Sequence, residues 1–556
     1  MTVQRPHRST PIAGAIDTYT GVEFNLGFHI LHYNLEITYN ANPNHLRATA
    51  TLSMENYRPL KSLTLDLADA LRVSKVEVRG HGAARTEPEL KAKLQLKRYR
   101  QSNKKLRLTF TDEIPEDLSF DIVIHYAGNP RPLRSKWGEV GWEETNNGAL
   151  VAGQPNGAPS WFPCDDTPDE KATYRIAFTT NKDITAVATG TQTAISHRGA
   201  WTTRVFEVNY PMATYLVAVY VGPYQQTNLP DAQLGRKTVP VHAWLPFGDH
   251  QARLIRDRFA HDFADQSAMV EVYSEMFGPY PFPAYGVVIT DEVMEIPLEA
   301  QAMSMFGKNH ANGKKTWERL IAHELSHQWF GNSVGLVEWR DIWLNEGFAC
   351  YAEWLWFERS QGIPAEKHAR FHYHHLANKP QDLLLIDPGA DNMFDDRVYK
   401  RGALTVHALR VLLGDDDFFD LLRRWTSEHR FGLVETRDLE NLVLDIIQHR
   451  KDISAADVSS LFDSWLRRTE LPYFPAVASS VYFGTTPTSS LNEDLSGLPA
   501  ADLDTEVDSG GPARATARAA SQAMDVASQA GEAVSTAAKN AIDAAKNTLG
   551  KNPLGK

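Results

Sequence analysis

The sequence predicts a multidomain protein of the α+β class, on three observations. Its 556 residues are more than one hydrophobic core uses and suggest about three domains. Apolar residues recur with a period near two up to about residue 209 and with a helical period from about residue 254. Hydrophobic residues make up 42% and aromatic residues 10%, which is enough to fill packed cores.

The first half of the chain predicts an antiparallel sheet domain. Apolar and polar residues alternate in short runs, separated by Asn, Pro and Gly. This pattern is typical of strands with one buried face. The clearest runs are Leu35–Tyr39, Arg47–Leu52, Val73–Val78 and Phe120–Ile124.

The second half predicts mainly helices, beginning with a long one that Gly278–Pro283 closes. The helical patterns cover residues 254–277, 317–331, 345–361, 401–413, 418–424, 437–447 and 458–467. We therefore expect five segments in the chain. They are a flexible N-terminus (1–14), a β-rich domain (15–225), a second domain (226–476), a disordered linker (477–512) and an Ala-rich tail (513–556).

The last segments differ in composition from the rest. No aromatic residue follows Phe483, and residues 485–511 are rich in Ser, Thr, Pro, Gly and acidic residues, which predicts a linker. A helical stripe of small apolar residues runs from Ala527 to Leu549. A marginal or disordered tail is our interpretation, and a weak amphipathic helix for a partner or a membrane surface is the alternative.

Charge and cysteine content exclude several classes of protein. The formal net charge of −12 gives nucleic acid and anionic membranes no general attraction to the chain. The two cysteines, Cys164 and Cys350, lie far apart in segments predicted to be buried, which excludes a disulfide framework. The start of the chain has no apolar leader segment, and no apolar run is long enough to span a membrane. We expect a cytoplasmic protein with no nucleic-acid partner and no stable membrane span.

The chemical centre of the sequence is His323-Glu324-Leu325-Ser326-His327, within a helical pattern. Positions i and i+4 lie on one face of a helix, so His323 and His327 can reach the same ion. Zinc suits nitrogen ligands, and three protein ligands leave a position open for water. Glu324 has a neighbouring helical position, from which it can approach that water rather than the metal.

A third ligand is needed to distinguish a metal site from two structural histidines. Glu346 lies at the start of a second predicted helix, and the 18 residues between it and His327 are enough chain for a loop and a return. Its carboxylate can complete the ligand set. We therefore expect one zinc ion per chain, bound by His323, His327 and Glu346.

These motifs carry a family resemblance. HELSHQWFGN, followed by the glutamate of WLNEGFA, resembles the gluzincin signature of the M1 zinc aminopeptidases. The resemblance extends to Phe277–Pro283, Phe162–Tyr174 and Trp465–Pro475, and so covers roughly residues 15–475. It implies a β-sandwich-like saddle domain followed by a thermolysin-like catalytic domain. It also implies a short form of the family, lacking the large C-terminal helical domain, with a cleft open to longer peptides.

The resemblance assigns two residues to catalysis. Glu324 would be the general base that takes a proton from a zinc-activated water. Tyr399 precedes a basic residue and Gly-Ala, as the catalytic tyrosine of the family does, and would stabilise the oxyanion. A packing role for Tyr399 is the alternative.

Recognition of a free α-amine requires a carboxylate near the metal. The family uses the glutamate of a GxMEN motif, of which this region has no intact copy, and Glu295 and Glu299 compete for the role. We choose Glu299, because 23 residues separate it from His323 and an apolar strand-like run follows it. The motif's glycine and asparagine become Ile296 and Ala300.

A glutamine that contacts the substrate N-terminus in the family corresponds to Gln154, for which a plain surface role is the alternative. His372, His374 and His375 form a cluster that we interpret as a solvated helix face rather than a second metal site. The resemblance therefore predicts an aminopeptidase acting on peptides with a free N-terminus. A catalytically degenerate zinc-binding interaction module and an endopeptidase are the alternatives.

Overall fold

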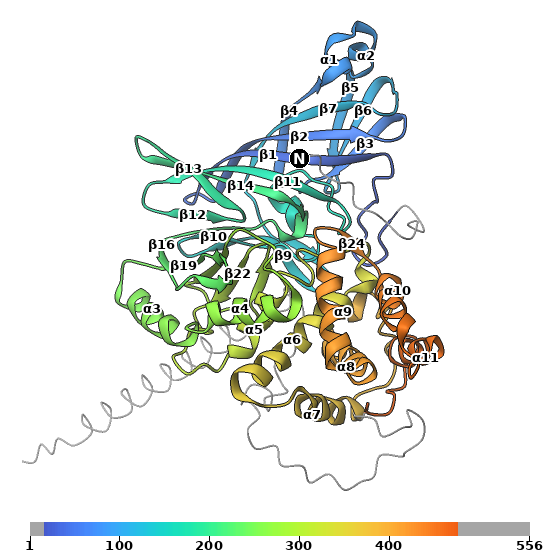
Figure 1. Cartoon of the computed structure of the whole chain (residues 1–556). Helices are drawn as coiled ribbons and strands as arrows, with labels where there is room; N and C mark the ends of the chain where they lie inside the picture. Colours follow the sequence, from blue (N-terminus) through green and yellow to red (C-terminus); the bar gives the residue numbers. More distant parts are fainter. Residues whose placement is uncertain (1–15, 476–556) are drawn as a thin grey trace, which may run out of the picture.

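The computed structural model describes residues 16–475. The predictions for residues 1–14, 477–512 and 513–556 therefore lie outside the described residues. The strands of the first half lie in the upper part of Figure 1, and the helices of the second half gather below them.

A seven-stranded sheet dominates the first half, in the order β13-β14-β11-β1-β2-β7-β4. Alternate residues of β2, from Leu46 to Met54, are buried, which is the predicted period of two. One pair, β1 and β11, is parallel, so the sheet is not antiparallel throughout as predicted. The strands are β1 (Phe28–Asn40), β2 (His45–Asn56), β4 (Leu71–Gly80), β7 (Ser119–Gly128), β11 (Lys171–Asn181), β13 (Thr191–Arg198) and β14 (Trp201–Ala213).

Two smaller sheets accompany it. A three-stranded sheet has the order β3-β6-β5, with β3 (Leu60–Asp66), β5 (Leu96–Ser102) and β6 (Lys105–Ile114). A five-stranded sheet has the order β12-β15-β10-β9-β8, with β8 (Leu133–Ser135), β9 (Gly138–Thr145), β10 (Gly148–Ala152), β12 (Thr185–Ala188) and β15 (Val219–Gly222). Two short helices, α1 (Gly82–Thr86) and α2 (Pro88–Lys93), follow β4.

The chain enters a further sheet immediately after β15. This sheet has the order β16-β19-β20-β22-β21, with β16 (Tyr224–Asn228), β19 (Val241–Pro246), β20 (Tyr285–Thr290), β21 (Leu298–Ala300) and β22 (Met303–Gly307). We infer a domain boundary at Pro223, where the chain changes sheet, close to the predicted 225. There are also two two-stranded sheets among the described residues. One pairs β17 (Ala232–Leu234) with β18 (Lys237–Val239), and the other pairs β23 (Gly335–Leu336) with β24 (Leu433–Val434).

The helices of the second half agree with the predicted patterns except at two places. They are α3 (His250–Asp262), α4 (Gln266–Phe277), α5 (Glu318–Ser326), α6 (Trp343–Gln361), α7 (Ala365–Ala377), α8 (Asp396–Leu413), α9 (Asp415–Glu428), α10 (Thr436–Ile446) and α11 (Ala455–Leu466). The single helix predicted over 254–277 is two helices, since α3 ends at Asp262 and α4 begins at Gln266. The carboxylate of Asp262 accepts hydrogen bonds from the backbone N–H groups of Gly313 and Lys315.

Helix α7 lies outside the predicted helical patterns, although its histidine cluster was interpreted as a solvated helix face, and the structure corrects that interpretation in part. His372 is buried and its ring stacks on Trp354, with centroids 5.4 Å apart. His374 is exposed, as expected of a solvated face. His372 therefore belongs to the core, because an uncharged imidazole packs well against an indole ring.

Helix α6 is a core helix of the second half of the chain. All of its residues from Trp343 to Phe357 are buried, as expected of a helix covered on every side. Cys164 and Cys350 are both buried and free, as predicted. Within residues 16–475, none of the helices has the length and apolar character needed to cross a membrane.

One buried ammonium group joins the two halves of the chain. Lys171 of β11 donates from Nζ to the carbonyl oxygens of Asn332, Ser333 and Gly432, at 3.2, 3.0 and 3.1 Å. The first two acceptors lie in the turn after α5, and the third immediately precedes β24. Burial lowers the pKa of Lys171 to about 7.

This lysine predicts a pH dependence of stability. The folded state binds the Lys171 proton less tightly than the unfolded chain, whose pKa is near 10.5, so stability rises with pH between about 7 and 10.5. The contribution is at most about 1.4 kcal/mol per pH unit. Urea unfolding at pH 7 and pH 9 should show a steeper rise for the wild type than for Lys171→Met. Equal slopes would contradict the assignment.

Candidate metal centre

Three predicted ligands converge at the junction of α5 and α6. His323 lies in the last turn of α5, His327 is the residue that ends this helix, and Glu346 lies in the first turn of α6. Oε2 of Glu346 lies 3.5 Å from Nε2 of each histidine. One ligand atom from each of the three residues lies within 4.8 Å of the others, and all three side chains are buried.

Hydrogen bonds on the far side of each imidazole orient the ligand nitrogens. Nδ1 of His323 lies 2.7 Å from Oε1 of Glu353, and Nδ1 of His327 lies 3.0 Å from the carbonyl oxygen of Phe330. Both partners are acceptors, so Nδ1 is the donor in each ring. In the neutral imidazoles, Nε2 therefore carries the lone pair and faces Glu346. Two such nitrogens and a carboxylate fit zinc.

The carboxylate behind His323 is itself held in place. Nη1 of Arg319 lies 3.1 Å from both oxygens of Glu353. Burial alone would raise the pKa of Glu353, but Arg319, Lys400 and the bond to His323 hold it at about 2. An ionised Glu353 keeps Nδ1 of His323 protonated.

Glu324 follows the first ligand on α5 and is 5% exposed. Burial, together with the neighbouring charges of Glu299 and Glu346, raises its pKa to about 8 against the opposing effect of the two histidines. The charges of Glu299 and Glu346 disfavour ionisation of Glu324, a repulsion that a divalent cation would offset.

Tyr399 lies in the first turn of α8, and its ring centroid is 6.0 Å from that of His323. Burial, followed by the charges of Glu346 and Glu299, raises its pKa well above the ordinary value. Its phenol is therefore a neutral hydrogen-bond donor at physiological pH.

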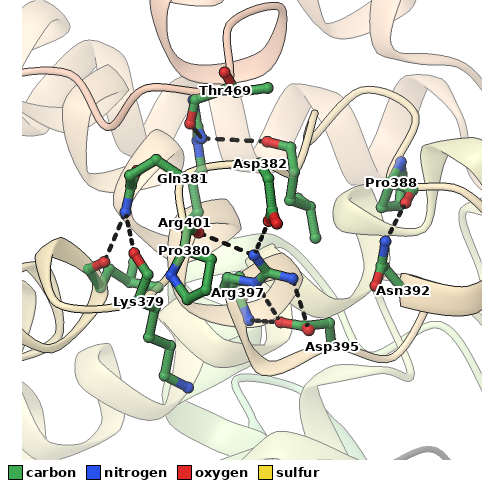
Figure 2. A network of polar contacts seen from close by, with 12 residues as sticks. Lys379, Pro380, Gln381, Asp382, Pro388, Asn392, Asp395, Arg397, Arg401 and Thr469 are labelled. Carbon is green, nitrogen blue, oxygen red and sulfur yellow. Dashed lines mark hydrogen bonds and ion pairs between the residues drawn. The ribbon is translucent and has the colours of Figure 1, made fainter.

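Arg397 and Arg401, two residues before and two residues after Tyr399, make polar contacts around the start of α8 (Figure 2). Arg397 binds Asp395 through two nitrogens, at 2.8 and 3.0 Å, and also reaches Asp382. Arg401 is buried and donates to the carbonyl oxygens of Trp465, Arg468 and Thr469, among others. The segment that follows α11 is thereby tied to the helix that carries the tyrosine.

The two residues predicted to recognise the substrate amine meet beside the ligands. Nε2 of Gln154, two residues after β10, donates to Oε1 of Glu299 in β21 over 2.6 Å. Gln154 is only 6% exposed, so it is not a plain surface glutamine. Burial raises the pKa of Glu299. The charge of His327 lowers this pKa and that of Glu346 raises it.

Family models match both halves of the chain. The model described as the Peptidase M1 N-terminal domain matches residues 29–216, and the Peptidase family M1 domain matches residues 261–465. The chain belongs to peptidase family M1. The second match includes the three metal ligands, Glu324 and Tyr399.

Several curated relatives of this M1 peptidase are aminopeptidases. Aminopeptidase N of Lactococcus lactis is 28% identical over 361 residues, which are 58% of this chain and 38% of the relative. Aminopeptidase M1-D of Oryza sativa is 24% identical over 447 residues, which are 76% of this chain and 48% of the relative. The first relatives found are matched over between about a third and a half of their own length.

A solved structure agrees over most of the described chain. The M1 zinc metallopeptidase of Deinococcus radiodurans is 28% identical, with a TM-score of 0.70, and the match covers 83% of this chain and 99% of the other. A mutant of that protein has been solved with the substrate Tyr-Ser-Ala. The predicted multidomain α+β class, with a β-rich part followed by a helical zinc peptidase part, is confirmed.

Two groups of residues around the metal ligands were not predicted. Glu353 lies seven residues after Glu346, two turns further along α6 on the same face, and this spacing could have indicated it. Gln328 and Asn332 stand within the motif HELSHQWFGN, but no spacing rule connects them to β21, which they contact.

Proposed function

We propose that this M1 peptidase is a zinc-dependent aminopeptidase that removes residues from peptides with a free N-terminus. The observation that carries the proposal is the bond between Gln154 and Glu299, next to the converged metal ligands. A carboxylate beside the metal, partly neutralised by an amide donor, is suited to bind an α-ammonium group. Such an anchor limits cleavage to the first peptide bond, since only that bond would then reach the metal.

The residues of the site divide the reaction among them. Zinc, when bound by His323, His327 and Glu346, would polarise the scissile carbonyl and make an attacking water more acidic. Glu324 would accept the proton of the water and return it to the leaving amine. Tyr399 would donate a hydrogen bond to the carbonyl oxygen as negative charge develops there.

Hydrolysis of aminoacyl-arylamides by the purified full chain tests the proposal. We expect turnover that a chelator abolishes and added zinc restores, and no turnover of N-acetylated substrates. Cleavage of N-acetylated peptides would instead indicate an endopeptidase. Activity no higher than that of Glu324→Gln would indicate an interaction module.

Substitution of each candidate carboxylate shows whether Glu299 or Glu295 binds the substrate amine. Glu299→Gln removes a charge-assisted hydrogen bond to the substrate ammonium, which is worth about 1.5–3 kcal/mol, so kcat/KM should fall about 10- to 150-fold. Glu295→Gln is the matched control, four residues earlier, and should stay within about twofold of the wild type. The reverse result would move the anchor to Glu295.

We also infer a cytoplasmic location, which the two buried free thiols of Cys164 and Cys350 support, because free thiols are typical of reducing compartments. Gel mobility of the protein from its source cells, with and without reductant and thiol alkylation, would reveal a disulfide and so contradict this.

A further inference from the structure

The strand that carries Glu299 has little support from its own sheet. β21 is three residues long and lies at the edge, where β22 is its single neighbour in the sheet order. Glu299 pairs with Ser304 in this short ladder. A strand this short at an edge needs further contacts to hold a side chain in a fixed place.

Two buried amide side chains supply those contacts, and we call Gln328 and Asn332 the amide clamp. Nε2 of Gln328 donates to the carbonyl oxygen of Ala300 over 3.1 Å, and its Oε1 accepts from the backbone N–H of Ala302 over 2.7 Å. Nδ2 of Asn332 donates to the same Ala300 oxygen over 3.0 Å and to Oε1 of Gln328 over 3.2 Å. Both clamp residues are fully buried.

The clamp holds a turn that would not be stable alone. Ala302 has a φ of +62°, in the left-handed region, which is unfavourable for a residue with a Cβ. The bond from its N–H to Gln328 compensates for part of this cost. Because the clamp grips Ala300 and Ala302, it fixes the backbone next to Glu299.

The clamp is also tied directly to the metal ligands. The backbone N–H of Asn332 donates to the carbonyl oxygen of His327 over 3.0 Å, in the turn that follows α5. In that turn, Gly331 has a φ of +115°, and a Cβ there would lie 3.1 Å from Nδ2 of Asn345. The same short segment therefore places one metal ligand and grips the strand of the amine anchor.

We propose that Gln328 and Asn332 are positioning residues for recognition of the substrate N-terminus, setting the place of the Glu299 carboxylate relative to the metal. The inference rests on the proposed function, in which Glu299 binds the α-amine.

Two hydroxamate inhibitors distinguish a role of the clamp in positioning Glu299 from a role in the stability of the fold. An amino-acid hydroxamate would bind both metal and amine anchor, and the same hydroxamate without its amine would bind the metal alone. The ratio of their dissociation constants, measured by calorimetry on the zinc-loaded chain, reports recognition of the amine. In Asn332→Asp, an oxygen replaces Nδ2 and faces two other oxygens, so we expect this ratio to fall at least about tenfold. Binding of the amine-free compound should change less than about threefold.

Two controls show whether the effect passes through Glu299. Asn309 grips Met294 in the same way, through bonds of 2.8 and 2.9 Å, but in the loop before β21, so Asn309→Asp should leave the ratio unchanged. In a Glu299→Gln background, Asn332→Asp should cause no further loss, since the two residues act as one unit. Gln328→Met, of similar length, provides a second variant if Asn332→Asp fails to fold.

The outcomes are distinct. Equal weakening of both hydroxamates, or an unchanged ratio in Asn332→Asp and Gln328→Met, would overturn the positioning role while leaving the proposed function intact. A wild type that binds both hydroxamates equally would overturn the proposed function, and this inference with it.

Discussion

Glu324→Gln is expected to lower kcat by about 10²–10⁴-fold, the range typical of a lost general acid or base. The glutamine has nearly the same volume as the buried carboxylate it replaces, so packing on α5 should survive. An amide cannot accept the proton of the attacking water or return it to the leaving amine. Zinc content, by elemental analysis, should remain at one ion per chain, and KM should change little, since the loss lies in the transition state.

The same helix offers a matched control for this variant. Glu318, in the first turn of α5, accepts a hydrogen bond from Nε1 of Trp356 over 2.8 Å, and a glutamine can accept it equally well. Glu318→Gln should therefore keep activity within about twofold of the wild type. If Glu324→Gln retained more than about a tenth of wild-type kcat, another group would have to be the base.

Local helical geometry explains why the metal ligands could be found from sequence. His323 and His327 are four residues apart on one helix, so a single period sets their distance. Glu346 needed only a second helix that returns to the first, and α6 does so. Contacts within one helix, or between two helices that follow each other closely in the chain, can therefore be predicted from the spacing of residues in the sequence.

Contacts between distant parts of the chain cannot be predicted from residue spacing. Gln154 and Glu299 are 145 residues apart and meet only because the end of β10 lies against the edge strand β21. Their prediction therefore depended on resemblance to a family rather than on periodicity. The amide clamp was missed for the same reason, since Gln328 and Asn332 grip backbone atoms of another strand.

Three features were predicted wrongly from the sequence: the end of α3, the burial of His372 and the direction of the strand beside β1. At the end of α3, the carboxylate of Asp262 accepts hydrogen bonds from two backbone N–H groups about fifty residues further along the chain, a contact that the helical pattern over 254–277 could not reveal. His372 was assigned to a solvated face, yet the aromatic face of Trp354 covers it. The parallel pairing of β1 with β11 likewise follows from a crossover of more than a hundred residues.

Glu346→Gln is expected to remove both zinc and activity, because it replaces the one charged ligand of the set by a neutral amide. Its control lies two turns further along the same helix. Glu353→Gln keeps all three ligands but weakens the partner of His323 and of Arg319, and the loss of such a partner of a ligand costs about 10–100-fold in metal affinity or activity. The loss in Glu346→Gln should exceed that of Glu353→Gln.

Thermal unfolding shows this difference without any assay of turnover. Zinc that binds the folded chain raises its unfolding temperature as the ion concentration increases. We expect this dependence in the wild type, a weaker one in Glu353→Gln, and none in Glu346→Gln at concentrations that saturate the wild type. Because Oε2 of Glu346 lies 3.5 Å from both imidazole nitrogens, it is the atom that joins the two histidines into one site. A zinc response in Glu346→Gln equal to that of the wild type would mean that the two histidines bind the ion with some other carboxylate, and Glu299 would be the first to test.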